Sequence, residues 1–102
     1  MIDLKKIQKR IYANKVAKGF NVTDVNLEFS LTFTELAEAF RAYRTKKSDL
    51  GEELADVAIY LMGLAQILEI DLEEEMLKKI EKNERREYAK NDKGILERTK
   101  EG

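Results

Sequence analysis

The sequence predicts an all-α protein, a four-helix up-down bundle whose protomers assemble as a homo-oligomer. Three observations predict it. The chain of 102 residues has no proline and five glycines, 43% of its residues are apolar and 38% are charged, and the apolar residues recur at helical spacing. A chain of this length forms one small domain near the lower end of comfortable single-chain stability.

Four stretches carry the helical pattern, and we take them in chain order. We expect helices at about residues 2–17, at 27–44, from Ser48 as N-cap to about residue 69, and from about residue 71 toward residue 88. The short connections favour antiparallel neighbours and therefore the up-down order. Residues 1–88 would form the helical domain, and the polar residues 89–102 a tail that is mobile or ordered only by a partner or ligand.

The third stretch is apolar on nearly every side. Between Leu54 and Leu68 only Asp56, Gly63 and Gln66 interrupt the apolar run. A helix of this kind is typically buried within an assembly. Three small amphipathic neighbours in a chain this short do not cover it, so the sequence predicts at least a dimer.

Composition excludes several functional classes. Cysteine and histidine are absent, which removes disulfides, thiolate metal sites, histidine-containing zinc sites and histidine-activated nucleophiles. A net charge of −1 gives no general attraction to nucleic acid polymers or anionic membranes. Basic residues interrupt the N-terminal apolar residues, and the one long apolar run is too short for a comfortable membrane span. We therefore expect a cytoplasmic, soluble protein with neither a membrane nor a nucleic acid partner.

Two acidic pairs, Glu35-x-x-Glu38 and Glu53-x-x-Asp56, are the strongest functional signal. Residues three apart share a helical face, so each pair points in one direction. Two adjacent carboxylates in an apolar setting cost several kcal/mol unless a cation or proton compensates them. A hard divalent metal provides that compensation, and antiparallel helices would let all four carboxylates converge on one or more ions.

Each charged element also has a plainer interpretation. The Glu35–Glu38 pair could equally be solvated or paired with Arg41 and Arg44. Lys79, Asn83 and Arg86 lie at i, i+4 and i+7 and could receive phosphate oxygens, yet interleaved glutamates make a solvated face the commoner outcome for such a stripe.

Three segments together resemble the MazG-like all-α nucleoside triphosphate pyrophosphohydrolases. They are Glu35-Leu-Ala-Glu38-Ala-Phe, Glu52-Glu53-Leu-Ala-Asp56-Val-Ala-Ile-Tyr-Leu and Lys79-Ile-Glu-Lys-Asn83-Glu-Arg-Arg86-Glu-Tyr88, and the resemblance runs from about residue 18 to residue 88. It implies a dimeric or tetrameric four-helix fold that binds Mg²⁺, with Mn²⁺ as a substitute. It also implies cleavage of a nucleoside triphosphate between its α and β phosphates, which removes unwanted nucleotides from the pool.

The resemblance also assigns residues. Glu35, Glu38, Glu53 and Asp56 would hold the metal. Apart from the resemblance, the chain has no histidine, cysteine or evident serine nucleophile, so metal-activated water is the expected attacking group, with Glu38 or Glu53 accepting its proton. Lys79, Asn83 and Arg86 would hold phosphates, with Lys18 in a turn near the nucleotide. Phe20 in the same turn is expected to pack, with stacking on the base as the alternative.

One position departs from the family pattern. Many members carry a further glutamate one turn before the position of Glu35, where this chain has Thr32. The site would then be shifted one turn along, with Glu38 substituting, or bind metal more weakly. The alternative is a non-catalytic helical module for nucleotide binding or protein interaction with a decayed metal site, which pyrophosphate release would distinguish from an enzyme.

Overall fold

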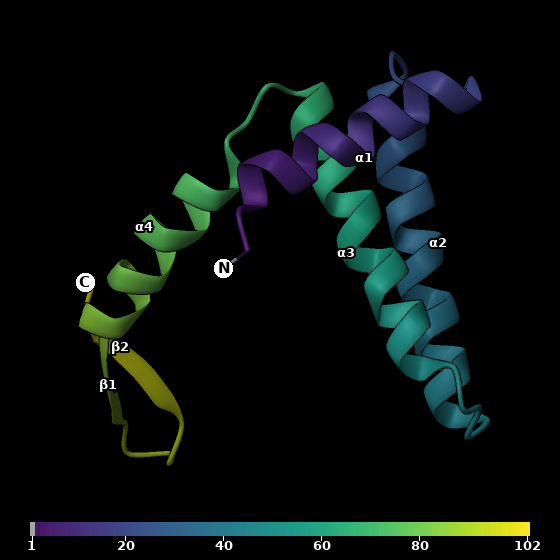
Figure 1. Ribbon diagram of the computed structural model, residues 1–102. Helices are drawn as coiled ribbons and strands as arrows, with labels where there is room; N and C mark the ends of the chain where they lie inside the picture. The colour runs from purple at the N-terminus through teal and green to yellow at the C-terminus, as the bar shows by residue number, and fades with distance from the viewer. Residues whose placement is uncertain (1) are drawn as a thin grey trace. The chain divides into compact units, whose positions relative to one another are not determined.

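The computed structural model describes residues 2–102, which form four helices and a two-stranded hairpin (Figure 1). The elements are α1 (Leu4–Lys18), α2 (Val25–Arg44), α3 (Leu50–Ile67), α4 (Leu72–Arg85), β1 (Glu87–Lys90) and β2 (Leu96–Lys100). The four-helix, all-α class is thereby confirmed. The chain divides into two compact units, one reaching Leu72 and the other Glu73–Gly102, and each is described by itself.

Local sequence fixes the ends of the first two helices. The carboxylate of Asp3 accepts a hydrogen bond from the Lys6 backbone N–H, and that of Asp24 accepts one from Leu27, so both aspartates cap otherwise unpaired amides. Gly19 ends α1 with a φ of 74°, a left-handed conformation that glycine adopts without strain.

In the first unit, α3 packs against both α1 and α2 (Figure 1). The apolar residues buried there are mostly small, with Ala39 and Ala42 on α2 and Leu64 and Ala65 on α3. Alanines let two helices approach closely, which brings the polar side chains beside them together.

Much of the apolar surface of α3 is uncovered in one chain. Leu54 is 52% exposed and Leu61 46% exposed, although the sequence pattern is that of a buried helix. Among residues 2–102, no helix is long and apolar enough to cross a membrane.

The second unit differs from the expected continuation of α4 and mobile tail. The helix ends at Arg85, and residues 87–90 pair with 96–100 as an antiparallel hairpin. The turn explains this, because the Asn91 side chain accepts hydrogen bonds from the Lys93 and Ile95 amides. Gly94 follows with a φ of 77°, so Asn91 and Gly94 supply the turn chemistry that a hairpin needs.

Candidate metal centre

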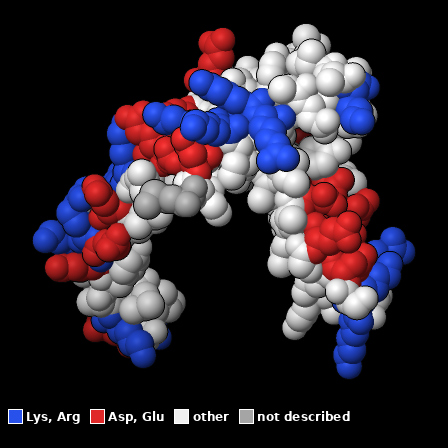
Figure 2. Space-filling view, in the orientation of Figure 1, with Lys and Arg blue, Asp and Glu red and all other residues white. Residues whose placement is uncertain are grey.

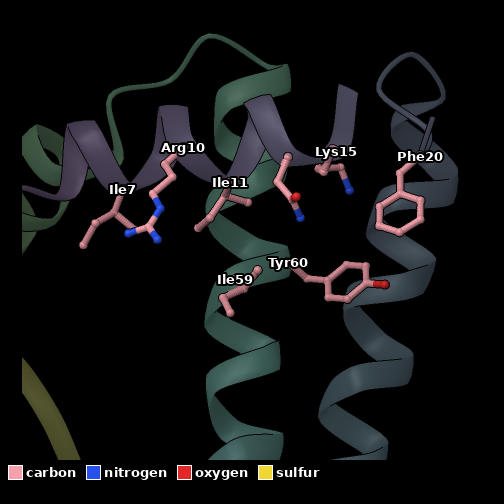
Figure 3. Close-up of a pocket in the computed structure, with 8 residues that line it drawn as sticks. Ile7, Arg10, Ile11, Lys15, Phe20, Ile59 and Tyr60 are labelled. Carbon is pink, nitrogen blue, oxygen red and sulfur yellow. The ribbon is translucent and has the colours of Figure 1, made fainter. Parts of the chain in front are cut away.

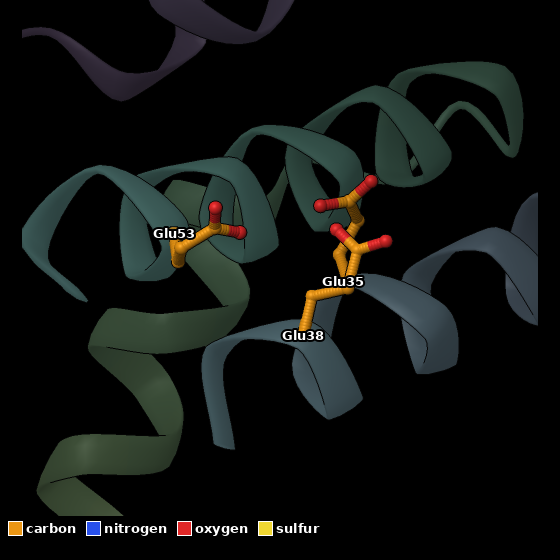
Figure 4. A group of neighbouring side chains, drawn as sticks. All are labelled: Glu35, Glu38 and Glu53. Carbon is orange, nitrogen blue, oxygen red and sulfur yellow. The ribbon is translucent and has the colours of Figure 1, made fainter. Parts of the chain in front are cut away.

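Acidic side chains gather on the face formed by α2 and α3 (Figure 2). Glu35 and Glu38 from α2 and Glu53 from α3 each place a carboxylate oxygen within 4.8 Å of the others (Figure 4). Asp56 is half-buried one turn further along α3 and adds its negative charge to Glu35 and Glu53. Three of the four predicted carboxylates thus converge, with the fourth close by.

The pKa values of two of these glutamates reflect the crowding of negative charge. Burial raises the pKa of Glu35, and the charges of Glu38, Asp56 and Glu53 raise it further. Burial also raises the pKa of Glu53, followed by the charges of Asp49 and Glu38. Both groups therefore hold protons more tightly than free glutamates, which is the response of carboxylates that lose hydration beside other negative charges.

Two carboxylate oxygens at this site have unmet bonding capacity. Oε2 of Glu53 and Oδ1 of Asp49 are buried, and neither accepts a hydrogen bond from any residue in the described range 2–102. Leaving a buried carboxylate oxygen without a partner is costly. A hard cation, which prefers several oxygen ligands, would satisfy these atoms, so the residues present fit a divalent metal.

Asp49 was missed by sequence reasoning, which expected Ser48 to cap the third helix. The structure places Asp49 at the N-cap position, but its side chain makes no capping hydrogen bond. Asp49 stands four residues before Glu53, and this i, i+4 spacing was the available signal. The negative charge of Asp49 raises the pKa of Glu53, so Asp49 adds to the acidic character of the cluster.

Thr32 supplies no carboxylate to the cluster. Its hydroxyl donates to the carbonyl of Glu28 one turn earlier, at 2.8 Å, a bond typical of threonine within a helix. Glu38 belongs to the converging group, as expected if the site lies one turn further along α2.

A buried ion pair lies beside the cluster and was also missed. Glu28 is 1% exposed and Lys15 9% exposed, and the Lys15 ammonium donates to the Glu28 carboxylate. The Asn21 amide donates to the second Glu28 oxygen at 3.1 Å, and the Lys15 nitrogen lies 5.3 Å from the ring centre of Tyr60. Glu28 precedes Glu35 by seven residues, two turns on one face, which was its only sequence signal.

Tyr60 lies near both this pair and the acidic cluster. Burial raises the pKa of its hydroxyl, and the charges of Glu35, Glu28 and Asp56 raise it further. Gly63 leaves room for the neighbouring lysine, since a Cβ at that position would approach the Lys15 side chain to 3.3 Å.

An open cavity of about 650 Å³ adjoins Tyr60 (Figure 3). It is lined by Ile7, Arg10, Ile11, Asn14, Lys15, Phe20, Ile59 and Tyr60. Phe20 is 58% exposed, so its ring faces the cavity and solvent instead of packing into the core as expected. Lys18 is the exposed last residue of α1 and is absent from the lining.

The basic stripe forms in the second unit. Arg86 donates from Nη1 to the Asn83 side chain at 3.0 Å and from Nε to the Glu101 carbonyl at 3.1 Å. The charge of Arg86 is the main cause that lowers the pKa of Lys79. The three predicted side chains therefore lie near one another, with part of the Arg86 fork engaged by the hairpin. Their role toward phosphate stays a prediction.

The solved structure of a MazG-like pyrophosphohydrolase from cyanophage S-2L, bound to dGDP and three catalytic Mn²⁺ ions per active site, has a similar fold with a TM-score of 0.61. The two chains are 23% identical, and the match covers 96% of this chain and 93% of the other. A search of curated proteins found no match. Residues 26–101 match the MazG-like family, so this chain, with its four helices and acidic face, belongs to that family.

Proposed function

We propose that this protein is a divalent-metal-dependent nucleoside triphosphate pyrophosphohydrolase. It cleaves between the α and β phosphates and releases a nucleoside monophosphate and pyrophosphate. The observation that carries the proposal is the convergence of Glu35, Glu38 and Glu53 beside an unpartnered buried oxygen, in a chain of the MazG-like family. The dGDP and Mn²⁺ bound by the cyanophage pyrophosphohydrolase support the same chemistry.

The carboxylates of the cluster have two proposed roles, metal binding and proton transfer. Glu35, Glu38, Glu53 and Asp56 hold Mg²⁺ or Mn²⁺, for which Asp49 is an added candidate ligand. When bound, the cation neutralises phosphate charge and makes the α-phosphorus more electrophilic.

Residues of the same cluster accept the proton of the attacking water. Glu38 or Glu53 takes a proton from the attacking water, whose oxygen forms the new bond to the α-phosphorus. The bond to the bridging oxygen breaks, and pyrophosphate leaves with that electron pair. Burial raises the pKa of Glu53 above that of a free glutamate, which is the direction that favours a general base.

Basic side chains are the proposed phosphate ligands. Lys18 of the first unit, and Lys79, Asn83 and Arg86 of the second, bind the phosphates of the substrate. Two of the five N–H groups of Arg86 are used by Asn83 and the Glu101 carbonyl, which leaves three for phosphate oxygens.

Self-association covers the exposed apolar faces, giving a homodimer or homotetramer. On α2 the exposed large apolar residues are Leu27, Phe29, Phe33, Leu36, Phe40 and Tyr43. A surface this apolar marks an interaction site. Light scattering should show more than one chain per particle, and Phe33→Ser, at the 71%-exposed position, should weaken the assembly. A stable wild-type monomer at micromolar concentration would contradict this.

The central test is a panel of nucleoside triphosphates assayed for pyrophosphate release with Mg²⁺ or Mn²⁺. Asp56→Asn and excess chelator should each abolish release, and Asp56→Asn should stay folded because a half-buried negative charge is removed. A metal-induced rise in Tm, reduced in Asp56→Asn, gives a readout independent of turnover. Metal-dependent nucleotide binding without pyrophosphate release would indicate the non-catalytic module instead.

A further inference from the structure

We propose that the cavity between α1 and α3 holds the base of the substrate and selects a 6-oxopurine, guanine or hypoxanthine. The inference rests on the proposed function, because it takes a nucleotide to be held at the carboxylates. The cavity volume of about 650 Å³ lies within the usual range for small-molecule sites and exceeds what a purine ring needs.

The walls of the cavity suit a flat aromatic ring. Ile7, Ile11 and Ile59 supply apolar surface, and Phe20 and Tyr60 supply aromatic faces (Figure 3). The Phe20 ring is more than half exposed, so a face remains free for stacking. Bases stack on such rings whatever their identity, which gives affinity without selecting among them.

Selection comes from the polar side chains of α1. Arg10 lies on the cavity wall between Ile7 and Ile11 (Figure 3), and Asn14 lines the same space one turn later. Among residues 2–102, neither side chain has a hydrogen-bond or ion-pair partner, so both are available to a ligand. Lys15 is different, because its ammonium is held by Glu28.

The donor pattern favours a keto base. Arginine presents a planar fork of donors and no acceptor. A 6-oxopurine offers two acceptors, O6 and N7, along one edge, and the fork can bind both. Adenine has an amino donor at that edge beside N7, so one arm of the fork would meet a donor. No carboxylate lines the cavity, and the Asn14 amide oxygen is the acceptor there that could receive an amino group, so the preference for a keto base is assigned to the Arg10 fork.

The cavity also lies at a suitable place relative to the carboxylates. Tyr60 follows Asp56 by four residues, about 6 Å along the axis of α3. The Tyr60 hydroxyl experiences the charges of Glu35 and Asp56, so the cavity wall borders the acidic cluster. A base in the cavity therefore directs its ribose and phosphates toward the proposed metal ligands.

Arg10→Ala is the direct test, with kcat/KM measured for GTP, ITP and ATP. The wild type should prefer GTP and ITP to ATP. Arg10→Ala should lose about tenfold to a hundredfold with GTP and ITP and stay within about twofold with ATP. Arg10→Lys should resemble Arg10→Ala, because an ammonium cannot span both acceptors. Lys9→Ala removes a neighbouring exposed charge outside this cavity and should leave all three values unchanged.

Equal use of ATP and GTP by the wild type, or an equal loss of all three substrates in Arg10→Ala, would overturn the inference and leave the proposed function intact. A second copy seated in the cavity would instead make Arg10→Ala change the oligomeric state with base preference unaltered, which also overturns it. Equilibrium binding of non-hydrolysable α,β-methylene analogues of GTP and ATP decides the point even if no triphosphate is cleaved. Tighter binding of the GTP analogue that depends on Arg10 supports the cavity assignment in that case, and equal binding refutes it.

Discussion

The acidic cluster of α2 and α3 and the basic end of the second unit are both dense in charge, but their charges are satisfied to different degrees. In the cluster, Glu35 and Glu53 have raised pKa values and Oε2 of Glu53 has no donor in the described chain. In the second unit, Arg98 pairs with Glu101 at 3.1 Å, and the Arg86 fork is partly bound. Charges that the fold leaves unsatisfied are the ones available to a ligand.

The Lys15–Glu28 pair shows the same contrast within the first unit. Glu28 is more deeply buried than Glu35, yet it has a cation and an amide donor, so its charge is compensated inside the protein. Burial alone therefore does not mark the carboxylates that we propose as metal ligands. The absence of an internal partner distinguishes the cluster from the pair.

Removing a carboxylate from the cluster should have the largest effect. We expect Glu53→Gln to lower kcat/KM by about a hundredfold to ten-thousandfold, because a proton acceptor and metal ligand is lost. Without divalent cations the same variant should have a higher Tm than the wild type, since repulsion is relieved. Glu52→Gln, at the exposed adjacent position, should keep near-normal activity. Full activity in Glu53→Gln would remove it from the site.

The stability gain of Glu53→Gln should depend on pH with a defined sign. The folded-state pKa of Glu53 is raised, so the folded wild type binds this proton more tightly than the unfolded chain and gains stability as pH falls through that pKa. The advantage of glutamine should therefore be greatest near neutral pH and shrink in acid. Thermal melts in chelator between about pH 4 and pH 8 measure it, and an advantage that grew in acid would refute the assignment.

Breaking the Lys15–Glu28 ion pair should lower stability more than catalytic activity. Glu28→Gln leaves the Lys15 ammonium buried without its anion, and the expected loss is about 3–5 kcal/mol of unfolding free energy. Replacing both residues, as Lys15→Met with Glu28→Leu, should recover most of it because no buried charge remains. Urea denaturation of the single and double variants tests this, and strictly additive losses would show that the pair is not coupled.

Helix periodicity allowed most of the fold to be predicted. The first three helices begin and end within a few residues of their expected limits, because apolar spacing, Gly19 and the short connections are local signals. The hairpin was not predicted, since its strands are short and polar. Its formation depends on the turn that Asn91 and Gly94 make.

The site was predictable only where its residues share one helix. Glu35 with Glu38 and Glu53 with Asp56 follow from i, i+3 spacing, and antiparallel packing brings three of them together. The partnership of Lys15 with Glu28 and the cavity beside Arg10 depend on how α1 lies against its neighbours, which no spacing within one helix reveals.

Arg86 gives the smallest and most discriminating prediction, because it serves the hairpin and, in our proposal, phosphate. Arg86→Ala should weaken every nucleoside triphosphate to a similar degree, by roughly 1.5–3 kcal/mol for a lost charged hydrogen bond. Arg86→Lys should restore little, since lysine lacks the planar fork. Arg85→Ala at the neighbouring exposed position is the control and should leave binding unchanged.

Loss of the Arg86 bond to the Glu101 carbonyl should also loosen the hairpin, so amide hydrogen exchange at residues 96–100 should accelerate in the same variant. Because the two roles use different N–H groups, the two measurements separate them. Faster exchange with unchanged triphosphate affinity would make the stripe purely structural. A changed preference among bases, with overall affinity kept, would assign the stripe to base recognition and contradict the role of Arg10. A uniform loss of affinity for all triphosphates would show that the Arg86 guanidinium, which the fold satisfies only in part, also binds phosphate.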